Sequence, residues 1–173
     1  MADLTLNTPS GQTIDRELVI AFLNTGTSST PVWSPLGKRV PDSSANYEWN
    51  ADTTRDILGQ VWGSMRNPII TQPFEPSNLD AGDPAIVKIW NMAVKDQDAR
   101  ALAAQDMLIV HFYAGEENTP FAERYSACMI EATGLGGEGG ADLSMPINVT
   151  YGGTRTVGTA AKAQDGTITF TPA

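Results

Sequence analysis

Only one segment of this 173-residue chain has the pattern of an amphipathic helix, and strand-like segments surround it. Asp83 is a typical N-cap residue, and Pro84 occupies the first helical position, where its missing N–H costs nothing. At 100° per residue, the apolar side chains up to Lys95 fall within an arc of roughly 160°. They are Ile86, Val87, Ile89, Trp90, Ala93 and Val94. We therefore predict a helix over 84–95 whose packing face is centred on Ile86, Trp90 and Val94.

A continuous apolar run, Met107–Tyr113, is typical of a strand that is buried on both faces and could receive this helix. Arg124–Ala132 is its predicted hairpin partner across 114–123. Asp56–Trp62 is also predicted as a strand, with Ile57 and Val61 on one face and Leu58 and Trp62 on the other. A further extended segment is expected over 67–73, where flanking prolines favour a sheet margin.

The clearest alternation lies in Leu143–Tyr151, where odd-numbered apolar residues face one way and the polar residues face the other. Gly152-Gly153 and Asp165-Gly166 are turn signals that lead into two more strands. Short strands with one helix predict a mainly β fold, a β-sandwich or partly open barrel with the helix packed on its side. We expect a single domain over 1–173, with an N-terminal arm over 1–16 and a long, weakly structured loop over 24–44.

The net charge, the cysteine count and the lack of long apolar segments exclude several classes of protein function. The formal net charge is −9 and the pI is about 4.4, which argues against nonspecific binding of phosphates. A single cysteine, Cys128, excludes an intrachain disulfide framework and a cysteine zinc site. The first residues lack the pattern of a signal peptide, and no apolar run is long enough to span a bilayer. The sequence therefore predicts a protein made in a cytoplasm, without a membrane anchor.

The search for catalytic groups gives no candidate. His111, the only histidine, lies within a predicted strand and is interpreted as structural, because a general base needs an aligned nucleophile. Cys128 is predicted to be a small buried residue that faces the same way as Ser126 and Ile130. Gly134-x-Gly136-x-x-Gly139 has dinucleotide-binding spacing, but a strand rather than a helix follows it, so we interpret it as a flexible loop. We predict no enzyme activity, no cofactor and no metal site.

Three segments carry a resemblance to a known family. Tyr47-Glu48-Trp49-Asn50, then Asp56-Ile-Leu-Gly59, then Gln72-Pro-Phe-Glu-Pro76 precede the single helix. In this order they are similar to the major tail (tail-tube) proteins of long-tailed bacteriophages. The resemblance extends more loosely through the last third of the chain.

The resemblance implies a structural virion protein made in the bacterial host cytoplasm. Such subunits form hexameric rings that stack into a tail tube, and their inner sheets line a channel through which DNA passes without specific binding. The implied partners are further copies of the chain, a tape-measure protein and other tail proteins. On this basis we expect the polar face of Leu143–Tyr151, with Ser144, Asn148 and Thr150, to line the lumen, and the loop over 24–44 to bridge rings while contributing little to the core.

Two other functions stay open. One is an inner-tube protein of a contractile or secretion-type injection system, which would share the ring architecture. The other is a non-tube β-sandwich binding module, in which Trp33, Trp49 and Trp62 would form an exposed ligand platform.

Overall fold

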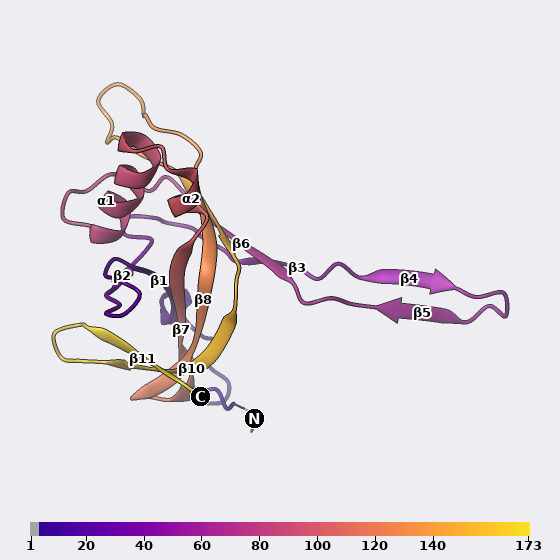
Figure 1. The fold of residues 1–173 in the computed structure, drawn as a ribbon. Coiled ribbons are helices and arrows are strands. Elements are labelled where there is room, and N and C mark those ends of the chain that lie inside the picture. The colour runs from indigo at the N-terminus through magenta and orange to yellow at the C-terminus, as the bar shows by residue number, and fades with distance from the viewer. Residues whose placement is uncertain (1–3) are drawn as a thin grey trace.

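The computed structural model describes residues 4–173 and has a mainly β fold, as the sequence predicts (Figure 1). The strands are β1 Val19–Asn24, β2 Trp33–Pro35, β3 Asn46–Glu48, β4 Asp52–Arg55, β5 Val61–Ser64, β6 Ile69–Phe74, β7 Gln105–Glu116, β8 Thr119–Ala132, β9 Ile147–Tyr151, β10 Arg155–Lys162 and β11 Ile168–Pro172. A 3₁₀ turn, Arg16–Leu18, precedes β1. The helices are α1 Pro84–Trp90, its π-helical continuation η2 Asn91–Lys95, and the short α2 Ala99–Leu102.

Nine strands form one open, antiparallel sheet that is not closed into a barrel. Its main path runs β2-β1-β7-β8-β9-β6-β3. The sheet branches at β8, because the first part of β8 also pairs with β10, which in turn pairs with β11, whereas its last part pairs with β9. β4 and β5 form a separate two-stranded ladder.

The run predicted over 107–113 is buried on both faces over 107–110, because two cores lie on opposite sides of β1 and β7, whereas 111–113 are half-buried. Met107 and Ile109 face a core that α1 covers, and this core also holds Leu23 and Ile130. The side chains between them, Leu108 and Val110, face a second core with Phe22, Trp33, Ala122, Ala160 and Ile168, to which β10 and β11 contribute. The strict alternation of these strands thus serves two apolar layers at once.

The helix begins as predicted. The Asp83 carboxylate accepts hydrogen bonds from the backbone N–H groups of Ala85 (3.0 Å) and Ile86 (3.3 Å), which satisfies two donors of the first turn. Ile86 and Ile89 are buried, whereas Trp90 and Val94 are only partly buried against the same core. The most deeply buried part of the packing face is therefore at Ile86 and Ile89, and the face becomes more exposed towards Val94.

The strand predicted over 56–62 is wrong. Residues 56–60 form the turn between β4 and β5, and the apolar side chains around it are exposed. The strand predicted over 143–151 is shorter than expected, since β9 begins at Ile147 and Leu143 is 51% exposed.

The segment over 24–44 is largely irregular but does contribute to the core, contrary to our expectation. β2 lies inside it and pairs with β1. Trp33 is buried in the second core and Leu36 in the first. The Arg124 guanidinium lies 5.6 Å from the centre of the Trp33 ring and makes a bidentate ion pair with Asp106. Removing this segment would therefore expose both cores.

Candidate assembly surfaces

The first candidate surface is the outward face of β8, β9, β6 and β3, which includes two of the predicted lumen residues. Thr150 pairs with Met129 of β8 on one side and with Thr71 of β6 on the other, and Thr71 pairs with Asn46 of β3. In the next row Asn148 lies between Glu131 and Pro73. The side chains one position away in β9, Ile147, Val149 and Tyr151, are buried on the opposite face. Asn148 and Thr150 thus lie on one continuous sheet face that β8, β9, β6 and β3 form together.

This outward face carries no positive charge at its ladder positions. The side chains at these ladder positions are Asn46 and Glu48 in β3, Ile69, Thr71 and Pro73 in β6, Asn148 and Thr150 in β9, and Met129 and Glu131 in β8. Two glutamates are its only charged residues, and most of the remaining side chains are small and neutral. Such a face does not bind polyanions, because it has no positive charge to attract them and two negative charges that repel them.

Ser144, the third predicted lumen residue, lies outside this ladder. It forms an isolated bridge with Gly136, and its hydroxyl donates to the Gly136 carbonyl (3.0 Å). A second bridge joins it to Asn78. Ser144 thus fastens the glycine-rich loop to the end of the sheet, while Asn148 and Thr150 belong to the sheet face itself.

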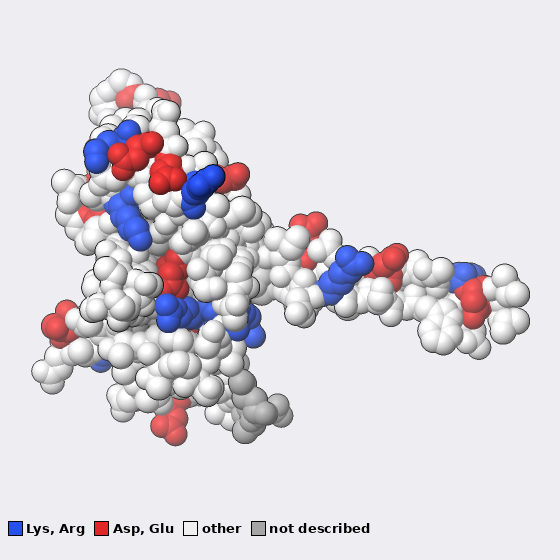
Figure 2. All heavy atoms as spheres, viewed as in Figure 1, with Lys and Arg blue, Asp and Glu red and all other residues white. Residues whose placement is uncertain are grey.

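The second candidate surface is an arm that sequence reasoning missed. β4 and β5 extend away from the body as a long hairpin, which leaves the sheet after β3 and returns at β6 (Figure 1). All residues of β4 and β5 are exposed. Acidic and basic side chains are interspersed along the arm (Figure 2). A two-stranded hairpin has no core of its own, so the apolar side chains of this arm are left in contact with solvent in the single chain.

The tip of the arm is an ordered turn with two apolar side chains at its end. The Asp56 carboxylate accepts hydrogen bonds from the backbone N–H groups of Leu58 (2.9 Å) and Gln60 (2.9 Å) and from the Trp62 indole (3.1 Å). These bonds, chiefly that of Trp62, lower the pKa of Asp56. Ile57 is 102% exposed and Leu58 is 80% exposed. Aspartate and glycine in Asp56-Ile-Leu-Gly59 are turn residues, and this signal could have located the tip.

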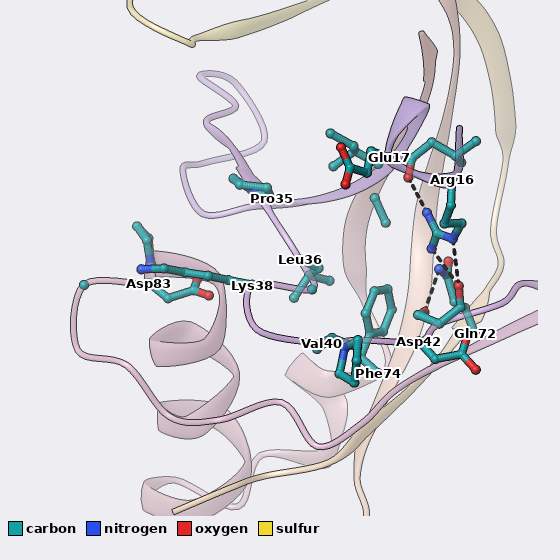
Figure 3. A pocket seen from close by; sticks show the side chains of 18 residues that line it. Arg16, Glu17, Pro35, Leu36, Lys38, Val40, Asp42, Gln72, Phe74 and Asp83 are labelled. Carbon is teal, nitrogen blue, oxygen red and sulfur yellow. Dashed lines mark hydrogen bonds between the residues drawn. The ribbon is translucent and has the colours of Figure 1, made fainter. Parts of the chain in front are cut away.

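The third feature is a cleft of about 770 Å³ between β1, the segment over 35–43 and the start of α1 (Figure 3). Leu36, Val40 and Phe74 form its apolar floor, and Pro35, Pro41 and Pro84 lie around it. We refer to it below as the proline-lined cleft.

A chain of hydrogen bonds fixes one wall of this cleft (Figure 3). The Arg16 guanidinium donates to the carbonyls of Ser43 (2.6 Å) and Val19 (2.8 Å). The Ser43 hydroxyl donates to the Pro73 carbonyl (2.6 Å) and accepts from the Gln72 amide (2.9 Å). Tyr151 donates in turn to Gln72 (2.7 Å). The cleft is therefore pre-formed rather than a gap between loose segments.

The sequence predicted a structural role for His111 but not the side chains to which it is hydrogen-bonded. The ring Nε2 lies 2.8 Å from Glu123 and Nδ1 lies 3.2 Å from the Tyr113 hydroxyl. The Glu123 carboxylate also accepts from Arg155 (2.6 Å) and Tyr125 (3.0 Å). Burial alone would raise the pKa of Glu123, but the hydrogen bonds and charges of His111 and Arg155 hold it at about 2. The buried Glu123 is thus the centre of a hydrogen-bonded polar cluster whose Arg155 side chain reaches the surface.

Cys128 is buried, as predicted, and burial raises the pKa of its thiol to about 11. The prediction that Ser126 faces the same way is wrong. The β7–β8 register shifts between the pairs Met107–Tyr125 and Gln105–Cys128, so that Tyr125 and Cys128 both face the first core while Ser126 is exposed. A β-bulge of this kind inserts one residue and reverses the alternation.

The three tryptophans of the hypothetical ligand platform do not share an environment. Trp33 is buried in the second core, whereas Trp49 and Trp62 are 49% and 64% exposed and belong to the arm. Within residues 4–173 there is no group of three or more histidine, cysteine, aspartate or glutamate residues placed to hold a metal ion. In the same part of the chain, no helix has the length and apolar character that crossing a membrane requires.

No protein-family model and no curated protein matches this chain. Among solved structures, one similar chain belongs to the sheath/tube terminator, in its extended state, of the extracellular contractile injection system PVC. It is 9% identical, the match covers 86% of this chain and 99% of that chain, and the TM-score is 0.50. Two others, both at a TM-score of 0.49, come from the cap that terminates the tube of the anti-feeding prophage and from the PVC sheath–tube complex in the extended state. The first is 14% identical and covers 89% and 96% of the two chains, and the second is 9% identical and covers 87% and 94%. The likeness to the terminator chain, at a TM-score of 0.50, supports the predicted tail-tube-like fold, and at 9% identity it concerns the fold alone.

Proposed function

We propose that this protein is a structural subunit that assembles with copies of itself into stacked hexameric rings, forming the tail tube through which phage DNA passes. The observation that carries the proposal is the arm. A long hairpin with exposed apolar residues at its end gains nothing for an isolated subunit, but it gains buried area when it lies on a neighbour. The sequence resemblance to tail-tube proteins and the tail-tube-like fold support the same function.

In this proposal the outward face of β8, β9, β6 and β3 lines the channel. Asn148 and Thr150 occupy its middle strand, and Glu48 and Glu131 are its only charges at ladder positions. A neutral to acidic wall offers the DNA phosphates no lysine or arginine to bind, so that DNA slides without being retained. The excess of acidic residues over the whole chain, 20 against 11 basic residues, works in the same direction.

The proposed partners follow from this arrangement. They are further copies of the chain, and, by the resemblance, a tape-measure protein and other tail proteins. The proposed location is the virion tail, after synthesis in the cytoplasm of a bacterial host. We propose no catalytic role and no cofactor, since the one histidine and its neighbours form a closed structural cluster.

A second candidate is a tube or terminator component of a contractile injection system. The likeness to a chain of the PVC sheath/tube terminator favours it. The two functions differ in what surrounds the tube and in what passes through it. Electron microscopy of the native particle that contains the protein would separate them, because a tube joined to a DNA-filled head indicates a phage tail and a sheathed particle without DNA indicates an injection system.

The test has two parts. Electron microscopy of the purified protein should show rings or tubes with a central hole, and uniform single subunits at high concentration would contradict self-assembly. Lysines at Asn148 and Thr150 should then leave tube formation intact but cause DNA to be retained, with a strong salt dependence. The matched control places lysines at Thr169 and Thr171, which are exposed residues of β11 far from this face in the sheet order. Equal DNA retention by both variants would remove this face from the channel.

A further inference from the structure

Hydrogen bonds hold the tip of the arm in a defined turn, although nothing within residues 4–173 covers it. Asp56 fixes the turn through three hydrogen bonds, and Arg55 precedes it at the end of β4. Ile57 and Leu58 project from this turn into solvent. Ordering two apolar side chains in advance reduces the entropy cost of burying them in a partner.

The proline-lined cleft has the complementary properties. Its floor of Leu36, Val40 and Phe74 is apolar, and its volume of about 770 Å³ lies in the range that proteins use to enclose apolar groups. Proline rings at three places limit the movement of its backbone, and the bonds of Arg16 hold the wall beside it. A short apolar knob can therefore enter without rearrangement of the cleft.

Charges around the two features also match. Glu17 and Asp42 line the cleft and are exposed, and Arg55 stands beside the tip. Among residues 4–173 none of these three side chains is in an ion pair. Lys38, another residue of the cleft, is already bound to Asp80 (2.7 Å). Arg16, the other basic residue of the cleft, is in no ion pair within the described residues but donates to the backbone carbonyls of Ser43 and Val19. The acidic side chains Glu17 and Asp42 are therefore the charges left to attract the Arg55 guanidinium of an approaching tip, whose Asp56 carboxylate is bound within its own turn.

The arm cannot serve its own cleft, because it extends away from the body on the side opposite to the helices and β2 (Figure 1). We propose that the tip residues Ile57 and Leu58 of one copy occupy the proline-lined cleft of a second copy. The contact is head-to-tail, with different surfaces on the two copies, and such contacts propagate into rings or open stacks. This inference rests on the proposed self-assembly and names the surfaces that carry it.

Cross-linking between two differently labelled full-length proteins tests the contact. One protein carries Leu58→Cys, and the other carries Pro41→Cys or, on the other side of the cleft, Glu17→Cys. The native Cys128 is 0% exposed and does not compete for a maleimide reagent. The control partner carries Thr169→Cys on β11. A short bismaleimide should join Leu58→Cys to both cleft positions at least about tenfold more than to the control, and this result supports the inference.

The outcomes separate the inference from the proposed function. Rings or tubes that form with no cleft cross-link above the control overturn the inference and leave self-assembly standing. Cross-links to the cleft in small oligomers that never form rings support the inference and contradict the tube. A protein that neither assembles nor cross-links overturns both. Ile57→Asp, a substitution that touches no core, should abolish the cross-link when it is added to the Leu58→Cys protein. Unchanged assembly of the variant with Ile57→Asp and Leu58→Asp would also overturn the inference.

Discussion

Replacing Glu123 by glutamine should destabilise the protein at neutral pH and destabilise it less in acid. The Glu123 carboxylate is buried and is bound by His111, Arg155 and Tyr125. Its pKa falls from 4.5 to about 2, and a difference of that size corresponds to roughly 3 kcal/mol of stability at neutral pH. Because the Arg155 side chain is 52% exposed and water screens its charge, we expect roughly 2 kcal/mol in practice.

The folded protein lowers the pKa of Glu123, so the stabilisation is fully present above the unfolded value of 4.5 and is lost as the pH falls from there towards 2. Glu123→Gln lacks this titration. The difference in unfolding free energy between the two proteins should therefore shrink over that interval.

Urea unfolding followed by tryptophan fluorescence, at about pH 7 and about pH 3 and with dilute protein, measures this difference. Glu131→Gln on the same strand is the matched control, since Glu131 is exposed and lies outside the cluster. The control should stay within about 0.5 kcal/mol of the unmodified protein at both pH values. If Glu123→Gln costs the same at both pH values, the ionised carboxylate is not what stabilises the cluster.

Three further predictions concern the fold. Ile89→Ala should cost about 3 to 4 kcal/mol in urea unfolding because Ile89 is fully buried, whereas Trp90→Ala should cost about 2 because its ring is only partly covered; a larger cost at Trp90 would contradict this order. Asp83→Ala should cost about 1 kcal/mol by removing the N-cap bonds of α1, and Asp83→Asn should restore most of it. Gly158→Ala should detach β11, measured as faster trypsin cleavage after Lys162, since an added Cβ would lie 2.1 Å from the Thr171 carbonyl oxygen; Gly134→Ala, with nothing within 4 Å, is its control and should be neutral.

Local patterns predicted the helix and most strands because their causes are local. Asp83 and Pro84 act within one turn of α1, and the buried run over 107–110 needs only its own alternation to fill two apolar layers. The outward positions of Asn148 and Thr150 follow in the same way from the neighbouring apolar residues of β9.

The arm was missed because hydrophobic periodicity assumes that apolar residues are buried. Ile57, Leu58, Val61 and Trp62 satisfy a strand pattern, yet all of them are exposed in the isolated chain. A sequence pattern of apolar residues does not by itself distinguish side chains that are exposed from side chains that fill a core. The turn residues Asp56 and Gly59 were the better guide.

The Glu123 cluster and the bulge could not be found from local pattern at all. Glu123 meets His111 across β7–β8 and Arg155 across β8–β10, and these pairings depend on registers set elsewhere in the sheet. The reversal at Ser126 is coupled to Gly153, where any side chain would collide with Ala127. These are non-local consequences of how one strand meets three others.

The pairing of β6 with β9, two strands far apart in the sequence, bears on how the chain folds during synthesis. β6 pairs only with β3 and β9, and β9 follows β7 and β8 in the sequence. β6, which contains Ile70 and Phe74, is therefore synthesised long before β9, the strand with which it pairs. Such long-range pairing slows folding and leaves an unpaired strand edge open to other chains. Because the arm leaves the sheet after β3 and returns at β6, the sheet that holds its base is complete only when β9 has paired with β6.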